Sequence, residues 1–182
     1  MAGKVEIEAR EIHVDDARPL HAAFAGTPWG DRGLAFFESL ATQHADDSLC
    51  AWVGLAAGRP VGFGSLLWQS NYPPFRESGK PEIHDLNVAP QARRQGVASA
   101  ILDLAEGVAL RRHDRVGIGV GLHPGYRAAQ RLYVLRGYVP DGNGVFWNGR
   151  FPSEGEPVLL DDALVLYLLK ERDESRTSAP RF

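Results

Sequence analysis

The strongest constraint in this sequence lies between residues 82 and 112, where a strand pattern passes through a short basic turn into a long helix. Apolar residues recur along E-I-H-D-L-N-V, as is typical of a β-strand, and Pro90 then forces a turn because its ring fixes φ and removes a donor. From Gly96 to Arg112 apolar residues fall three or four positions apart, which predicts a helix that buries one stripe. The sequence therefore predicts a strand, a turn and a helix in direct succession.

The turn has the properties of an anion-binding site. The first backbone amides of a helix have no intrahelical acceptor and carry partial positive charge. Gly96 lets an anion come close to the backbone, and Arg93 and Arg94 add formal charge. A diphosphate is the ligand that matches this combination, although an ordinary loop with solvated arginines has the same composition.

The motif R-x-x-G-x-A, which follows a strand ending in N-V-A-P, resembles the acetyl-CoA signature of GNAT (Gcn5-related) N-acetyltransferases. The resemblance implies an α/β (α+β) fold with a central mixed, mostly antiparallel sheet, splayed central strands and flanking helices. It also implies that the strand, the turn and the start of the helix bind acetyl-CoA, through Leu86, Asn87, Val88, Arg93, Arg94, Gln95, Gly96, Val97, Ala98 and Ser99. A backbone amide near Val88 would stabilise the oxyanion.

A second segment, A-A-Q-R-L-Y-V-L-R-G-Y, is similar to the A-x-x-L-Y-x-x-x-G-F/Y helix of the same family. The resemblance implies that Tyr133 lies beside the thioester sulfur and protonates the departing thiolate. A phenol with a pKa of about 10 can donate to a thiolate whose acid has a pKa of about 8.5. The alternative is a packed aromatic residue whose hydroxyl bonds elsewhere. The resemblance also implies that Tyr126 contacts the pantetheine of the cofactor, although family members often carry Asn at this position and this chain departs from them in that side chain.

The acceptor amine must lose a proton before it attacks, because an alkylammonium with a pKa of about 10.4 is mostly protonated at pH 7. Glu82 matches the register of a glutamate in Gcn5-like histone acetyltransferases, and the same strand resembles one of some aminoglycoside acetyltransferases. We therefore expect Glu82 to act as the base through water, with Asp85 as second candidate. In an extended strand Glu82 and His84 share a face and Asp85 points oppositely, unless a bulge intervenes. Each could equally be a solvated or salt-bridged residue.

The remaining segments predict alternating strands and helices. V-G-I-G-V-G-L places glycine at every second position, which does not match the spacing of a dinucleotide fingerprint and predicts a strand open to close approach by a backbone or a ligand. One domain is expected over residues 5–170, with a flexible tail at 171–182. We expect strands at 5–12, 48–56, 61–69, 116–122, 144–147 and 164–169, helices at 17–24, 34–42 and 126–136, a loop at 72–80 and a turn at 139–143.

Net charge and cysteine content indicate which binding partners and which cell compartment to expect. The 182 residues carry a formal net charge of −3, which gives no general attraction to nucleic acid or to an anionic membrane. The single cysteine, Cys50, excludes an internal disulfide and fits a reducing compartment, and no apolar leader or spanning segment is present, so a cytoplasmic protein is expected. No metal-binding motif occurs. The sequence does not determine the oligomeric state, and a homodimer is one possibility.

The patterns and the resemblance together predict an N-acetyltransferase that moves an acetyl group from acetyl-CoA to a primary amine by direct attack. The alternative is a non-catalytic module that binds or senses acyl-CoA. The acceptor is left open among a protein terminus, a lysine, an antibiotic, a polyamine and an amino acid. An acidic group near the last hairpin would attract a cationic amine or simply be a solvated loop: Glu154, Glu156, Asp161 and Asp162.

Overall fold

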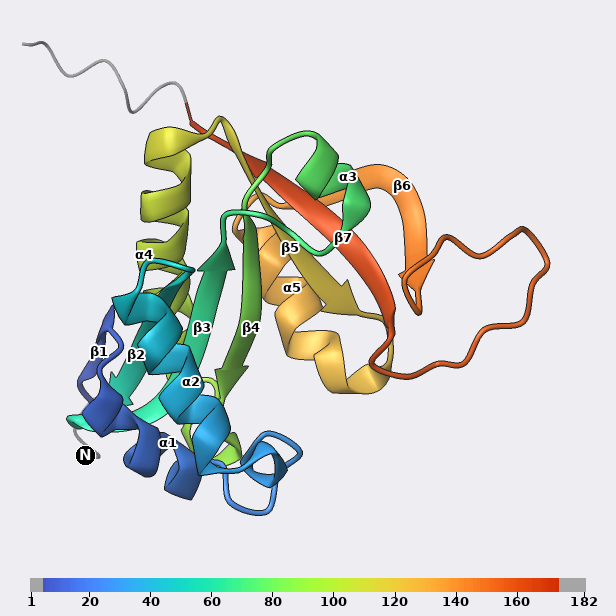
Figure 1. Ribbon diagram of the computed structural model, residues 1–182. Helices are drawn as coiled ribbons and strands as arrows, with labels where there is room; N and C mark the ends of the chain where they lie inside the picture. Colours follow the sequence, from blue (N-terminus) through green and yellow to red (C-terminus); the bar gives the residue numbers. More distant parts are fainter. Residues whose placement is uncertain (1–4, 174–182) are drawn as a thin grey trace, which may run out of the picture. The chain divides into compact units, whose positions relative to one another are not determined.

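A computed structural model describes residues 5–173, and the chain divides into two compact units (Figure 1). Of the described residues, the first comprises 5–68 and 83–108, and the second 69–82 and 109–173. Each unit combines antiparallel strands with helices, which confirms the expected mixed α/β class with mostly antiparallel strands. The expected single domain over 5–170 stays a prediction.

The first unit is built on strands that neighbour one another in chain order. They are β1 (Ile7–Glu11), β2 (Cys50–Ala56), β3 (Arg59–Leu67) and β4 (Glu82–Val88), of which the first residue, Glu82, is counted with the second unit. Its helices are α1 (Ala17–Ala23), α2 (Leu34–Ala45) and most of α4 (Val97–Arg112), with short 3-10 turns η1 (Val14–Asp16), η2 (Gly30–Arg32) and η3 (Pro90–Ala92). Antiparallel pairing joins β1 to β2 and β2 to β3.

The two faces of β2 and β3 pack against different helices because successive side chains alternate across a strand. One face carries Val53 and Phe63, which belong to a buried core shared with α1 and α2. The opposite face carries glycines, and a Cβ placed on Gly54 would lie 2.5 Å from the Val97 side chain of α4. The glycines therefore let α4 pack directly on the strand backbone, on the side away from α1 and α2 (Figure 1).

The second unit contains β5 (Arg115–Gly121), β6 (Val139–Trp147) and β7 (Leu164–Glu171), with β7 paired antiparallel to both others. Its helical elements are α3 (Pro73–Glu77), η4 (Pro124–Tyr126) and α5 (Arg127–Leu135). A small aromatic core joins α3 to the strands and is made of Tyr72, Phe75, Phe146 and Tyr167, together with Leu169.

The alternating glycines of β5 lie on a face that aromatic rings cover. A Cβ on Gly117 would lie 2.0 Å from the ring of Phe75, and one on Gly121 would lie 2.3 Å from the ring of Tyr126. Between them, Gly119 is opposite Tyr167 of β7 in the strand register. The sequence predicted that a backbone or a ligand would lie close to this strand. Within the second unit, aromatic side chains lie against its glycines instead.

Three expected segments differ from the structure. The loop predicted at 72–80 contains α3, because Pro73 and Pro74 occupy the first positions of a helical turn that their fixed φ permits. The turn predicted at 139–143 lies inside β6, where a register shift between Pro140 and Val145 absorbs the turn-forming residues. Of the tail predicted at 171–182, Glu171 ends β7, and residues 174–182 lie outside the described part of the chain.

Candidate active site

The turn between β4 and α4 is exposed and has an unusual backbone. Arg94 and Gly96 both have positive φ, of 62° and 100°, and the first helical hydrogen bond runs from the Ala100 amide to the Gly96 carbonyl at 3.0 Å. The amides of Val97, Ala98 and Ser99 therefore precede the helical ladder and are available to an anion.

The two arginines of this turn differ in their contacts. Arg93 donates from Nε to the Val88 carbonyl at 3.1 Å, so its side chain folds back onto the strand. Arg94 is exposed and makes no side-chain hydrogen bond or ion pair to another residue within 5–173. Gln95 donates to the Gln91 carbonyl at 3.3 Å. Arg94 is thus the basic side chain that can turn to a bound phosphate.

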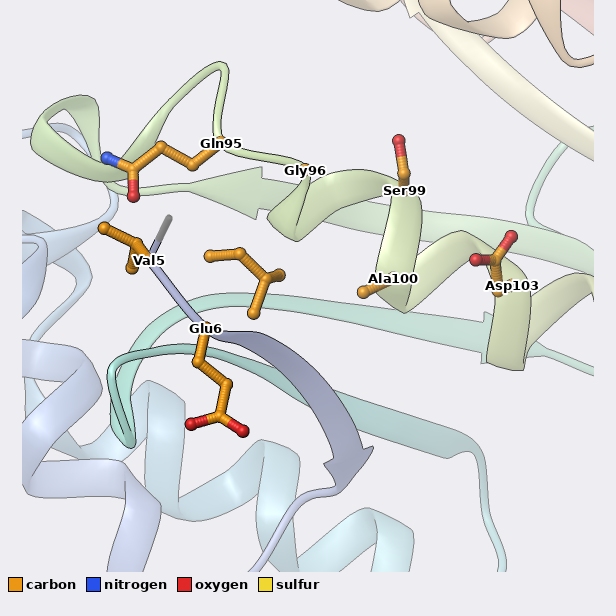
Figure 2. A pocket seen from close by; sticks show the side chains of 8 residues that line it. Val5, Glu6, Gln95, Gly96, Ser99, Ala100 and Asp103 are labelled. Atoms are coloured by element: carbon orange, nitrogen blue, oxygen red, sulfur yellow. The ribbon is translucent and has the colours of Figure 1, made fainter. Parts of the chain in front are cut away.

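An open groove of about 600 Å³ runs beside this turn, between the start of β1 and the first turns of α4 (Figure 2). Figure 2 shows Ala100 on the side of α4 that faces β1, whereas the Ser99 hydroxyl points away from that strand. The formal charges that line the groove are the negative ones of Glu6 and Asp103. Because a diphosphate needs the opposite charge, we do not assign the cofactor to this groove.

The strand before the turn is half-open and irregular. His84 to Val88 are each only partly buried, and this stretch contains Leu86, Asn87 and Val88, three of the expected cofactor residues. Asp85 has a positive φ of 51°, which is rare outside glycine and interrupts the simple alternation of faces. The Ala89 amide donates to the Val61 carbonyl at 2.8 Å, so this amide near Val88 is already bonded.

Asp85 pairs with a residue from η2. The Arg32 guanidinium lies 3.6 Å from Asp85 Oδ2, and it also covers the rings of Trp29 and Phe36 at 4.8 and 4.3 Å from their centroids. His84 Nδ1 lies 3.4 Å from the other carboxylate oxygen of Asp85. The second candidate base is therefore held by an ion pair, which is the structural alternative that the sequence left open.

Glu82 has a different environment in the second unit. It is 3% exposed, and its Oε2 accepts a hydrogen bond from the Ser70 hydroxyl. The nearby charge of Glu82 contributes, after burial, to raising the pKa of the Tyr167 phenol. A buried carboxylate with a hydroxyl donor is suited to accepting a proton.

Tyr133 lies on α5 and is 5% exposed. Burial, and then the proximity of Tyr126, raise the pKa of its phenol, so it stays protonated at neutral pH. Its hydroxyl makes no hydrogen bond to another residue in the described range 5–173. The role of Tyr133 as the acid stays a prediction.

Tyr126 is held by its own network. Its hydroxyl donates to Asp162 Oδ1 at 3.1 Å, and His123 Nε2 lies 2.7 Å from the same oxygen. The Gly125 amide donates to His123 Nδ1 at 3.0 Å, so the proton of a neutral ring is on Nε2. The bond from His123 is the main reason that the pKa of Asp162 is lowered. A contact from Tyr126 to pantetheine stays a prediction.

Sequence reasoning missed two residues that hold the candidate bases, Ser70 and Arg32. The sequence predicts loops for both segments, and no local pattern predicts that a loop serine is 1% exposed or that a loop arginine stacks on two rings.

Two of the acidic residues expected near the last hairpin have partners in the structure. Asp162 bonds His123 and Tyr126, and Arg150 holds the pKa of Glu156 at about 2.

Within residues 5–173, no helix is long and apolar enough to cross a membrane. Nor do three or more His, Cys, Asp or Glu side chains gather there in a way that would hold a metal ion.

A sequence model of the acetyltransferase (GNAT) family matches residues 11–138, which include the β4–α4 turn and α5. No curated protein gives a sequence match.

Solved structures share the fold over nearly the whole chain. An N-acetyltransferase from Staphylococcus aureus Mu50 has 16% identity and a TM-score of 0.65, over 91% of this chain and 98% of that one. A GNAT-family acetyltransferase from Streptococcus pneumoniae has 18% identity and a TM-score of 0.63, over 92% and 100%. The PaiA N-acetyltransferase from Thermoplasma acidophilum, solved in complex with coenzyme A, has 12% identity and a TM-score of 0.62, over 92% and 99%.

Proposed function

Because this chain belongs to the acetyltransferase (GNAT) family, we propose that it transfers the acetyl group of acetyl-CoA to a primary amine by direct attack. The observation that carries the proposal is the β4–α4 turn, where Arg94, which has no side-chain partner among residues 5–173, lies beside the amides that precede the helical ladder of α4. This arrangement fits the diphosphate of a CoA thioester, since helix amides and an arginine both stabilise phosphate charge. A similar fold binds coenzyme A in the Thermoplasma acidophilum protein.

The cofactor residues proposed from the sequence would have different roles in binding. The amides of Val97, Ala98 and Ser99 and the guanidinium of Arg94 would bind phosphate, whereas Arg93 and Gln95 shape the turn through bonds to its backbone. Leu86, Asn87 and Val88 would lie along the acyl arm, because their part of β4 is only half-buried.

The proposed chemistry needs a base and an acid. Glu82 takes a proton from the ammonium, directly or through water, and the neutral nitrogen then forms a bond to the acetyl carbon. The carbon–sulfur bond breaks, Tyr133 donates its phenolic proton to the thiolate, and the surplus proton of the new amide returns to the phenolate. The net products are the acetylated amine, CoA and one proton, which Glu82 releases to solvent. Glu82 is preferred to Asp85, because Asp85 is paired with Arg32.

The competing proposal is a module that binds or senses acyl-CoA without chemistry. Two groups favour the enzyme, since a binding module has no need of either. They are the hydroxyl of Tyr133, which bonds no other residue among 5–173, and the buried carboxylate of Glu82.

A calorimetric titration with acetyl-CoA tests the cofactor site, with an NAD analogue as the control compound. Saturable binding of the thioester alone supports the proposal, and absence of binding overturns it. A thiol-release assay over a panel of amines then separates the enzyme from the module. The panel needs a peptide terminus, a lysine peptide, an aminoglycoside, a polyamine and an amino acid. Binding without thiol release from any of them would favour the module.

A further inference from the structure

A buried serine in the chain segment that follows β3 and precedes α3 contacts the carboxylate that we propose as the base. Ser70 is 1% exposed and Glu82 is 3% exposed. The Ser70 hydroxyl bonds Glu82 Oε2, and the Tyr72 amide donates to the same Ser70 oxygen at 2.9 Å. The contact is therefore one link in a chain that starts at a backbone amide.

The backbone amide sets the direction of that chain. An amide can only donate, so the Tyr72 N–H occupies an acceptor site of the Ser70 oxygen. The single hydroxyl hydrogen of Ser70 is then left to point at Glu82 Oε2. Ser70 acts as a donor to Glu82, and a donor favours the charged form of a carboxylate.

Other contacts hold Tyr72, and with it the amide that orients Ser70. Its ring is stacked on Tyr167 with centroids 3.7 Å apart, and its hydroxyl donates to Asp141 Oδ2 at 2.8 Å. The titratable groups that face this site come from β7 and β6: Tyr167, whose pKa burial, Glu82 and Asp141 all raise, and Asp141 itself. The charge of Asp141 disfavours a further anion at this site, whereas the bond from Ser70 favours the charged form of Glu82.

We propose that Ser70 is a positioning residue that keeps Glu82 ionised and fixes the orientation of its carboxylate for proton transfer. The inference rests on the proposed role of Glu82 as base. Burial drives a carboxylate towards its protonated form, which cannot accept a proton, and each hydrogen-bond donor opposes that shift. Ser70 counters that tendency through a charge-assisted hydrogen bond, and it does so without touching the reacting atoms.

The test is the pH dependence of kcat/KM for the amine in Ser70→Ala. We expect the acidic limb of the profile to move about one unit to higher pH, because a lost donor to a charged group is worth roughly that much. The KM for acetyl-CoA is expected to stay unchanged. Ser70→Thr keeps the hydroxyl and is expected to restore the limb. Ser70→Cys keeps the shape with a weaker donor, and its limb is expected between the other two.

Ser65→Ala is the matched control, because it also removes a buried hydroxyl. Ser65 is 2% exposed and donates to the His84 carbonyl at 3.1 Å, so its hydroxyl bonds the backbone rather than a carboxylate. Its loss is expected to leave the acidic limb in place. An equal shift in both alanine variants would show a general loss of packing and would overturn the inference.

Glu82→Gln distinguishes failure of this inference from failure of the proposed base. If Glu82→Gln leaves the acidic limb intact, Glu82 is not the base and both ideas fall. If Glu82→Gln abolishes the limb while Ser70→Ala and Ser70→Cys leave it at the wild-type pH, only the role of Ser70 is wrong. Should Ser70→Ala not fold, the comparison of Ser70→Cys with Ser70→Thr decides by the same criterion.

Discussion

The ring of Tyr72 lies parallel to the ring of Tyr167, with centroids 3.7 Å apart and planes within 7°. Tyr72 immediately precedes α3, and Tyr167 lies in β7. The Tyr72 hydroxyl also donates to Asp141 of β6, so one side chain joins three segments of the second unit. Because burial raises the pKa of both phenols, the stacked pair stays neutral beside Glu82.

Tyr133→Phe is expected to lower kcat about 100-fold, because a positioned general acid contributes at least that much. The KM for acetyl-CoA should change little, since the ring remains in place. Steady-state kinetics with a reactive amine measure both constants. Tyr138→Phe is the matched control, because its ring is also buried and lies 5.9 Å from that of Tyr133. Wild-type turnover in Tyr133→Phe would exclude Tyr133 as the acid.

Arg94→Ala is expected to weaken acetyl-CoA binding about tenfold, through loss of one charge-assisted contact to phosphate. The affinity of the wild type should fall with added salt more steeply than that of the variant, because salt screens exposed charges. Calorimetric titration at two ionic strengths measures both effects. Arg111→Ala removes an exposed arginine from the last turn of the same helix and should bind as the wild type does. Unchanged affinity in Arg94→Ala would show that Arg94 does not contact the cofactor.

Gly117→Ala is expected to destabilise the protein by about 1–3 kcal/mol, because the new methyl group overlaps a packed ring. The added carbon would lie 2.0 Å from Phe75, whereas at Gly119 the nearest heavy atom would be 3.0 Å away. Gly119→Ala is thus the matched control on the same strand and face, and its free energy of unfolding should fall by less than that of Gly117→Ala. Chemical denaturation gives both free energies of unfolding. Equal losses would mean that the Phe75 ring moves aside at little cost.

Asp16→Asn is expected to lower the free energy of unfolding at pH 7 by about 1–3 kcal/mol. Asp16 is 4% exposed, accepts from both terminal nitrogens of Arg10 at 2.7 Å, and accepts from the His13 amide at 2.8 Å. Burial alone would raise the pKa of Asp16, but the bonds from Arg10 and His13 outweigh it and lower the pKa.

The pH dependence of that loss follows from the direction of the shift. A carboxyl whose pKa is lower in the folded state stabilises the fold above its unfolded pKa, here the ordinary value of 3.8. The difference between wild type and Asp16→Asn should therefore be full at pH 7 and shrink as the pH falls below that value. Asp15→Asn, at an exposed neighbour, should show neither effect. A difference that is constant with pH would mean that the charge of Asp16 is not responsible.

Local patterns predicted the segment that carries the cofactor motif almost to the residue. The helix expected at 96–112 is α4, Val97–Arg112, and the strand expected before Pro90 is β4. These features depend on spacing, on the fixed φ of proline and on the freedom of Gly96, which all act within a few residues. The same reasoning failed at 72–80 and 139–143, where Pro and Gly marked turns but packing and strand pairing decided the conformation.

The sequence by itself determined the family, the mixed α/β class and the turn that would bind a diphosphate. Each of these follows from motifs or periodic patterns whose residues are close together along the chain. Only the tertiary structure decided which side chains meet: Ser70 with Glu82, and Arg32 with Asp85. Periodicity shows which face of one element is buried, but it does not show which distant segment covers that face. The environment of each candidate base therefore depends on folding contacts that no local pattern encodes.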